Sequence, residues 1–179
     1  MITRKAALED APGIAKVHVD SWRSTYKGIV PDTYLASLSY ENRERIWTSG
    51  IKENNVYIAE NESGKIVGFA TGGKERTGKY GAYVGELYAI YLLEGHQGKG
   101  IGQMLVQLVV NDLLDKKLNS MLIWAIEENP ACLFYEALGG KKIDIAEIEI
   151  EGKKLGEIAY GWNDLSNCFG KDHPSSIEK

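Results

Sequence analysis

The segment from Gly95 to Gly102 carries the clearest chemical signal in the sequence, because every second or third residue in it is glycine. Glycine allows a backbone to turn sharply and to bring its N–H groups close to a ligand. A strongly apolar helical pattern follows the segment, and the start of a helix adds unpaired N–H groups and the positive end of a dipole. Together these features predict an anion site suited to phosphate.

The spacing of these glycines narrows the kind of phosphate ligand. A Walker A loop needs four residues between its glycines and a Ser or Thr after its lysine, whereas Lys99 is followed by Gly100. The dinucleotide fingerprint needs G-x-G-x-x-G after the first strand of a βαβ unit, whereas the spacing here is G-x-G-x-G after the fourth expected strand. Both nucleotide loops are therefore poor matches. A glycine-rich turn that binds no ligand is the alternative interpretation.

Hydrophobic periodicity and turn residues predict the elements that must position this turn. We expect strands at 2–6, 56–59, 66–70, 83–93, 121–126, 143–150 and 155–162, and helices from Glu9 onward, at 32–52 with a break near Ser39, at 99–117 and at 130–138. The expected turns include 61–64, the glycine and charge cluster 72–79, and 151–153. Asn129 would cap the helix at 130–138, and Gly139-Gly140 would end it. This order favours an α/β fold with a mixed sheet and helices on both faces.

Length and composition are those of an ordinary globular chain. The 179 residues suit a single domain, which we place at 1–169, followed by a polar tail at 170–179. The formal net charge of -4 lacks the basic footprint of a nucleic-acid binder and is compatible with a cationic small substrate. No apolar run reaches the ~18 residues of a membrane span, and the N-terminus lacks the apolar core of a signal peptide. We therefore expect a cytoplasmic protein without a membrane partner.

Cysteine and histidine usage argues against a metal site. Cys132 and Cys168 lack metal-type and redox-type spacing, and the histidines are widely scattered. We therefore expect no bound metal, no disulfide scaffold and a reducing compartment.

Three motifs, in the same order along the chain, resemble those of the GNAT superfamily of N-acetyltransferases. Gln97, Gly100 and Gly102 fit that family's pyrophosphate motif, Gln/Arg-x-x-Gly-x-Gly/Ala. The stretch 85–92 looks like the family's fourth strand, and 129–140 looks like its second cofactor motif. The resemblance covers nearly the whole chain. It implies a central, mixed, mostly antiparallel twisted sheet of six to seven strands with helices on both faces.

The same resemblance implies that acetyl-CoA is the acyl donor. The residues expected to contact it are Ile90, Tyr91, Leu92, Gln97, Gly98, Lys99, Gly100, Ile101, Gly102, Asn129 and Tyr135. In the family the fourth strand splays, so backbone groups of 90–92 would face the pantetheine arm, where an N–H donor could polarise the thioester carbonyl. Asn129 is equally well explained as a helix cap alone.

Tyr135 stands where the family has a tyrosine that reaches the CoA sulfur, which implies a general acid for the leaving thiolate. The alternative is a core aromatic residue beside Phe134. Cys132 could suggest an acyl-enzyme, but no histidine lies nearby in sequence and the family uses direct transfer.

Attack by an amine requires that its ammonium group lose a proton, because a primary alkylamine is mostly protonated at neutral pH. Glu86 is the first candidate for this base, since it begins the strand that leads to the glycine turn and lies within an apolar run. Burial there would make the carboxylate a better base, acting directly or through a water. The alternative is an edge carboxylate that faces solvent or pairs with Arg76 or Lys79.

The acceptor pocket is expected, by the same resemblance, to draw on the first two helices. Candidate lining residues are Trp22, Tyr26, Tyr34 and Trp47, and core packing or a dimer contact is the alternative for each of them. The segments 22–35 and 159–165 are similar to a common bacterial GNAT variant that carries no agreed substrate.

These observations favour an acetyl-CoA-dependent N-acetyltransferase that acts on a primary amine of a small molecule, by direct attack in a ternary complex. Acetylation of a protein amine is an open alternative. A second hypothesis is a non-catalytic acetyl-CoA-binding regulatory module, which would keep the turn at 97–102 but could dispense with Glu86 and Tyr135. Both are present, which favours the enzyme. A homodimer is expected from family habit alone.

Overall fold

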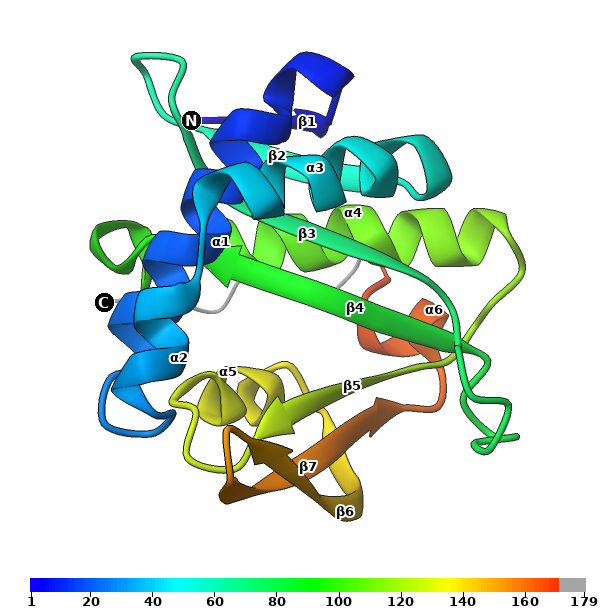
Figure 1. The fold of residues 1–179 in the computed structure, drawn as a ribbon. Helices are drawn as coiled ribbons and strands as arrows, with labels where there is room; N and C mark the ends of the chain where they lie inside the picture. Colours follow the sequence, from blue (N-terminus) through cyan, green and yellow to red (C-terminus); the bar gives the residue numbers. More distant parts are fainter. Residues whose placement is uncertain (171–179) are drawn as a thin grey trace.

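A computed structural model describes residues 1–170, and Figure 1 shows one sheet with helices on both of its faces. The strands are β1 (Ile2–Lys5), β2 (Val56–Glu60), β3 (Ile66–Lys74), β4 (Gly85–Leu92), β5 (Met121–Ile126), β6 (Lys141–Ile150) and β7 (Lys153–Trp162). Their order across the sheet is β1-β2-β3-β4-β5-β7-β6, and in this part of the chain only β4 and β5 pair in parallel. The expected mixed, mostly antiparallel sheet is confirmed. Beyond Gly170, the expected polar tail lies outside the described residues.

Helices form a layer on each face of the sheet. They are α1 (Ala11–Thr25), α2 (Asp32–Ser37), α3 (Tyr40–Glu53), α4 (Ile101–Asp115), α5 (Ala131–Ala137) and α6 (Leu165–Cys168), with short 3-10 turns η1 (Leu8–Asp10) and η2 (Glu94–His96). Helices α1 and α3 pack on one face, and α4, α5 and α6 pack on the other. The predicted break near Ser39 is confirmed, and the Ser39 side chain caps α3 by accepting from the N–H of Asn42. Among the described helices, none has the length and apolar character needed to cross a membrane.

The pair Gly72-Gly73 lies inside β3, so the turn expected at 72–79 is wrong at its start. A Cβ atom on Gly72 would lie 2.6 Å from Cγ1 of Val109 in α4 and 2.7 Å from the carbonyl oxygen of Glu86 in β4. The close approach of these two elements therefore requires glycine at this position, and no turn is involved.

Strands β4 and β5 separate soon after they begin. They pair at two positions, Gly85 with Met121 and Glu86 with Leu122, and then diverge toward their C-terminal ends (Figure 1). The other edge of β4 stays bonded to β3 along its whole length. The splayed fourth strand that the resemblance implies is therefore present.

The backbone of β4 presents unpaired groups to the resulting gap. Just beyond the strand, the N–H of Leu93 donates to the carbonyl oxygen of Val67 on the β3 side at 2.9 Å. Backbone groups alternate in direction along a strand, so those of Leu92 and Ile90 point away from β3 and toward the gap.

A β-bulge at Tyr88 changes which side chains of β4 share a face. The register between β3 and β4 skips Tyr88, which has no partner on β3. Leu87, before the bulge, packs on the α4 side of the sheet, whereas Tyr91, beyond it, packs on the α1 side. Glu86 therefore points to the same side as Tyr91, although an unbroken strand would place the two on opposite faces.

Candidate active site

The glycine turn ends in a row of unpaired backbone donors. Gly98 and Gly100 have left-handed φ angles of 70° and 77°, a conformation that residues with a Cβ atom adopt only at a cost. Within residues 1–170, no acceptor receives a hydrogen bond from the N–H groups of 98–103, which include the first turn of α4. Such a row at the positive end of a helix suits an anion with several oxygens, such as a phosphate.

Two side chains tie the turn to its surroundings. Nε2 of Gln97 donates to the carbonyl oxygen of Leu92 at 3.3 Å, which holds the turn against the end of β4. Nζ of Lys99 donates to the carbonyl oxygen of Gly95 at 2.8 Å, which closes the turn on itself. The Lys99 ammonium group is therefore fixed at the start of the turn and adds positive charge to this segment.

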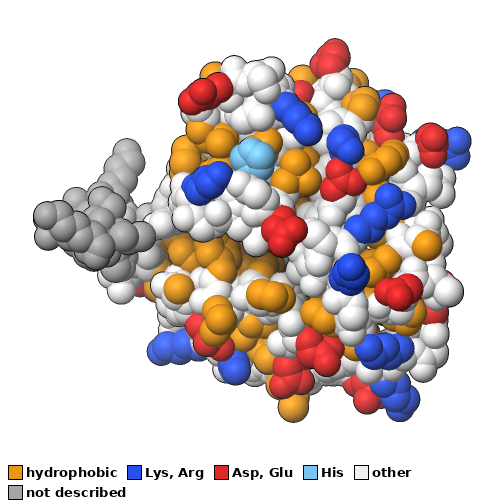
Figure 2. Space-filling view, turned by 90° about the vertical axis from the view of Figure 1, so that its left-hand side faces the viewer, with side chains coloured by type: hydrophobic (Ala, Val, Ile, Leu, Met, Phe, Trp, Pro, Cys, Tyr) orange, Lys and Arg blue, Asp and Glu red, His pale blue; other side chains and the backbone are white. Residues whose placement is uncertain are grey.

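Figure 2 views the side of the molecule toward which the C-terminal ends of β4 and β5 point in Figure 1. It shows a recess between the upper and lower halves of this face, with hydrophobic side chains on its floor and charged side chains around it. An apolar arm can lie in such a recess while the glycine turn that follows β4 holds an anion.

Gly102 links the turn to α5 and so to Tyr135. A Cβ atom on Gly102 would lie 3.1 Å from Cζ of Phe134, so glycine here lets α4 approach α5 closely. Tyr135 follows Phe134 and is buried, with 4% of its surface exposed. Its hydroxyl makes no hydrogen bond in the described part of the chain, whereas that of the neighbouring Tyr160 donates to Glu136. Burial, and then the charges of the nearby phenols of Tyr26 and Tyr91, raise the pKa of Tyr135 and keep it protonated.

Both polar groups of the Asn129 side chain are used within the protein. Its Oδ1 accepts from the N–H of Ala131, the first residue of α5, at 2.9 Å, so it satisfies a free N–H at the start of the helix although Pro130 holds the N-cap position. Its Nδ2 donates to the hydroxyl of Tyr26 at 2.9 Å. Cap and tyrosine contact together account for the side chain, so the geometry favours the capping interpretation over a cofactor contact. The Tyr26 hydroxyl keeps its own proton to donate.

Three of the predicted acceptor-lining residues come together on the α1 side. The ring centroid of Trp22 lies 4.4 Å from that of Tyr26, 5.8 Å from that of Tyr34 and 6.4 Å from that of Tyr91. Nε1 of Trp22 is buried and has no hydrogen-bond partner in residues 1–170. A buried donor left without an acceptor costs about 1–3 kcal/mol, so this N–H lowers the stability of the folded protein.

Trp47 lies apart from this cluster, in the core. It donates through Nε1 to Nδ1 of His18 at 3.0 Å and packs edge-on against Phe69. Burial, and then the positive charge of Arg43, lower the pKa of His18 to about 3. His18 is therefore a neutral core histidine that stacks on Tyr91, with ring centroids 4.9 Å apart.

Glu86 is buried and pairs with Arg76, one of the two alternatives that the sequence left open. Oε2 accepts from the backbone N–H and from Nε of Arg76, each at 3.2 Å, and Oε1 accepts from Nη2 at 2.5 Å. The pair fixes the loop between β3 and β4 to the sheet. Because Arg76 already donates to both oxygens, an incoming amine would have to displace it.

Glu157 is a second carboxylate on this side of the sheet, and sequence reasoning missed it. It lies in β7, is half-buried, and makes no ion pair or hydrogen bond with any described residue. Burial alone raises the pKa of its carboxyl. The sequence shows one acidic residue directly before the apolar run 158–162. Without a known strand register, it does not show to which face of the sheet that residue points.

Among residues 1–170, neither Cys132 nor the remaining acidic and histidine side chains form a competing site. The Cys132 thiol is buried, points at the carbonyl oxygen of Ile126 at 3.5 Å, and has its pKa raised chiefly by burial. It is therefore a protonated structural thiol. Within residues 1–170, no three or more His, Cys, Asp or Glu side chains gather as a ligand set for a metal.

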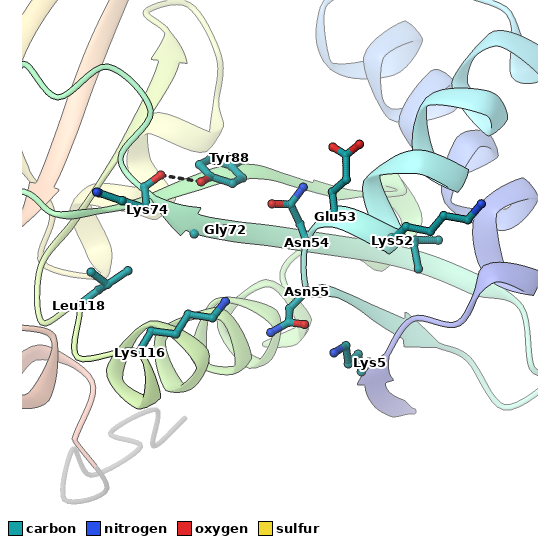
Figure 3. Close-up of a pocket in the computed structure, with 12 residues that line it drawn as sticks. Lys5, Lys52, Glu53, Asn54, Asn55, Gly72, Lys74, Tyr88, Lys116 and Leu118 are labelled. Atoms are coloured by element: carbon teal, nitrogen blue, oxygen red, sulfur yellow. Dashed lines mark hydrogen bonds between the residues drawn. The ribbon is translucent and has the colours of Figure 1, made fainter.

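A separate hollow of about 550 Å³ lies at the other end of α4, between the end of α3, the end of β3 and the segment 116–118 (Figure 3). The 15 residues of α4 span about 22 Å at 1.5 Å per residue, so this hollow is well removed from the glycine turn. Lys116 pairs with Asp112, and the ammonium groups of Lys52 and Lys74 point away from one another (Figure 3). The hollow therefore lacks converging groups and does not belong to the glycine-turn site.

Comparisons with known proteins agree on one family. The model of the acetyltransferase (GNAT) family matches residues 19–140. An uncharacterized N-acetyltransferase of Bacillus subtilis (strain 168), YuaI, is 46% identical over 167 residues, which covers 93% of this chain and 95% of the relative.

Solved structures share the fold at low sequence identity. A ribosomal-protein-alanine N-acetyltransferase from Brucella melitensis has a TM-score of 0.70 at 20% identity, covering 90% of this chain and 99% of the other. A PaiA N-acetyltransferase from Thermoplasma acidophilum, crystallised with coenzyme A, has a TM-score of 0.70 at 22% identity, covering 88% and 96%. With the family match and the close relative, these likenesses show that the chain belongs to the acetyltransferase (GNAT) family of enzymes.

Proposed function

We propose that this enzyme transfers the acetyl group of acetyl-CoA to the primary amine of a small molecule, by direct attack in a ternary complex. The observation that carries the proposal is the row of free N–H groups at 98–103, next to a strand that has parted from its neighbour. A pyrophosphate satisfies such a row, and an extended arm satisfies the open edge of β4. We also propose that residues 1–169 form one acetyltransferase domain.

On the donor side, the turn holds the pyrophosphate through backbone N–H groups, and Lys99 adds a positive charge beside it. The residues in this role are Gln97, Gly98, Lys99, Gly100, Ile101 and Gly102. The N–H of Leu92 or Ile90, directed into the gap, donates to the thioester carbonyl and stabilises the oxyanion that forms on attack. Tyr91 contributes its backbone to the same strand, while its side chain faces the acceptor.

Tyr135 donates a hydrogen bond to the leaving sulfur. A thiol has an ordinary pKa of about 8.5, and burial raises the pKa of the Tyr135 phenol above its own ordinary value of about 10. Full proton transfer from Tyr135 to the thiolate would therefore be uphill. A hydrogen bond to the charged sulfur still contributes about 1.5–3 kcal/mol. This is a narrower role than the general acid that the resemblance implies.

On the acceptor side, Trp22, Tyr26 and Tyr34 form the wall against which the amine lies. The Tyr26 hydroxyl, held by Asn129, supplies a fixed donor in that wall. The free thiols of Cys132 and Cys168 fit a reducing cytoplasm, which is the compartment we propose.

Acetyl-CoA binding and amine screening test the proposal together. Acetyl-CoA is expected to raise the thermal midpoint of the protein, since a ligand that binds only the folded state stabilises it. A panel of amines, polyamines, amino acids and peptides is then followed by thiol release. If millimolar acetyl-CoA produces no thermal shift, the whole proposal is contradicted. A shift without thiol release from any acceptor favours a non-catalytic binding module, and release with peptides alone favours a protein amine.

A further inference from the structure

Two carboxylates face the same side of the sheet but differ in what surrounds them. Glu86 points to the α1 side, because Leu87 next to it packs on the α4 side. Glu157 points there too, because Leu155, two residues before it in β7, packs in a cluster with Tyr26 of α1. Arg76 forms an ion pair with Glu86, whereas Glu157 forms no ion pair with any described residue.

Glu157 lies beside the C-terminal end of β5, where β4 and β5 have already separated. In the sheet it stands opposite Ile126, the last residue of β5 before the segment that carries Asn129. Ile126 packs in one cluster with Tyr26, and residues opposite each other in paired strands share a face, so Glu157 lies on the face of the sheet that Tyr26 covers. After burial, the charge of the Tyr26 phenol is the next cause of the raised pKa of Tyr135. Asn129, just before α5, donates to the Tyr26 hydroxyl, so Tyr26 connects this side of the sheet to the segment that leads to Tyr135.

A half-buried carboxylate without a partner is unfavourable, because burial removes part of its hydration and nothing in the protein replaces it. A cation placed beside it regains that energy. The aromatic rings of Tyr26 and Trp22, whose centroids lie 4.4 Å apart, cover the same side of the sheet, and aromatic rings attract cations. The arrangement is complementary to an ammonium group on an apolar body.

We infer that Glu157 receives the ammonium group of the acceptor and removes a proton from it, and that the acceptor is a cationic primary amine without a carboxylate next to its nitrogen. The inference rests on the proposed function and names the base and the substrate class of that same site.

The proton and electron balance of the step is complete. The Glu157 carboxylate takes one proton from R–NH3+, which leaves the neutral amine R–NH2 and a carboxylic acid. The nitrogen lone pair then forms the C–N bond to the thioester carbonyl carbon, and the C–S bond breaks with its electron pair on sulfur. A second proton passes from nitrogen to the thiolate, while Tyr135 hydrogen-bonds to that sulfur. Glu157 finally releases its proton to water, so the products are the N-acetyl amine, the CoA thiol and one proton.

Glu157→Gln tests this assignment with a matched pair of acceptors. The probes are 2-phenylethylamine, which is an ammonium ion at pH 7, and O-benzylhydroxylamine, which has nearly the same shape but an uncharged nitrogen. We expect the variant to lower kcat/KM for 2-phenylethylamine by about 100-fold or more, and to lower that for O-benzylhydroxylamine by less than about 10-fold. The thermal midpoint and the acetyl-CoA affinity should stay unchanged.

Glu149→Gln is the control, because Glu149 is an exposed carboxylate of the adjacent strand β6 and its loss removes the same charge. It should leave both acceptors unaffected. The wild type should also prefer 2-phenylethylamine to phenylalanine, which differs only by the carboxylate next to the nitrogen.

Equal turnover by Glu157→Gln and wild type, equal losses for both probes, or a preference for phenylalanine would each overturn the inference while leaving the proposed function intact. No thiol release by the wild type with either probe or any amine of the panel would overturn the proposed function, and this inference with it.

Discussion

The two sides of the gap between β4 and β5 offer ligand-binding groups of different origin. On the α4 side, the N–H groups of 98–103 come from one continuous stretch of backbone. On the α1 side, rings and a carboxylate come from four separate elements, as Trp22, Tyr34, Tyr91 and Glu157 illustrate. A backbone site depends on a few local torsion angles, whereas a side-chain site depends on how elements pack. We therefore expect the first side to bind the constant donor and the second to select the acceptor.

The largest effect is expected where the backbone site is broken. Gly100→Asp places a Cβ atom at a φ of 77° and a negative charge among the phosphate-binding N–H groups. Acetyl-CoA affinity, measured by calorimetry, should fall by about 100-fold or more.

Two further variants control this prediction. Gly81→Asp adds the same charge in the loop between β3 and β4, where glycine has no left-handed φ and no close neighbour, and it should change affinity little. Gly100→Asn, which tolerates the left-handed conformation without a charge, should fall between the two. Unchanged affinity in Gly100→Asp would show that the turn does not hold the donor's phosphates.

A smaller effect, on turnover alone, is expected at Tyr135. Tyr135→Phe removes the hydrogen bond to the leaving sulfur and should lower kcat by about 10- to 100-fold, with acetyl-CoA affinity within about twofold of wild type. Tyr160→Phe removes a neighbouring hydroxyl that donates to Glu136, and its kcat should match that of the wild type. Normal kcat in Tyr135→Phe would remove Tyr135 from the mechanism.

Asn129 contacts both the start of α5 and the Tyr26 hydroxyl, so its loss distinguishes an effect on the acceptor from an effect on the donor. Asn129→Ala uncaps α5 and frees the Tyr26 hydroxyl, so the free energy of unfolding should fall by about 1–2 kcal/mol in chemical denaturation. Acceptor KM should rise, and acetyl-CoA affinity should change by less than about threefold. A tenfold loss of acetyl-CoA affinity would instead support the cofactor contact that the family resemblance implies.

The smallest effect is expected from the unpaired indole. Trp22→Phe keeps an aromatic ring but deletes the buried N–H that lacks a partner. The free energy of unfolding should stay the same or rise by about 1 kcal/mol, while acceptor KM increases by a few-fold. A fall of more than about 2 kcal/mol would show that the cluster is a packing unit in which the indole shape matters most.

The same difference between the two sides explains what could be predicted from the sequence. The turn at 97–102 is recognisable because glycine spacing, a preceding strand and a following helix are all local features. The splayed β4 and the mixed, mostly antiparallel sheet followed from element order and motif resemblance, whereas the order of the strands across the sheet was not predicted. The turn predicted at 72–79 was wrong at its start, because glycine serves close packing at Gly72, which no local pattern distinguishes from a turn.

The acceptor side depends on alignment between strands that are distant in sequence. The bulge at Tyr88 decides that Glu86 and Tyr91 share a face, and a one-residue shift of β4 would reverse this. Glu157 lies on the same side of the sheet as Tyr26 only because β7 pairs with β5 in one particular register. Ion pairing of Glu86 with Arg76 was one of several options in the sequence, and the loop geometry selects it. Strand register and loop geometry depend on tertiary packing, so local sequence patterns could not predict the acceptor side.

The most direct test of the donor site is a titration of the isotope-labelled protein with coenzyme A, followed by amide NMR shifts. The largest changes are expected at the N–H groups of 98–103, and pantetheine, which lacks the pyrophosphate, should leave those six signals nearly unchanged. Changes that bypass 98–103, or that appear equally with pantetheine, would contradict the assignment of the glycine turn as the pyrophosphate site.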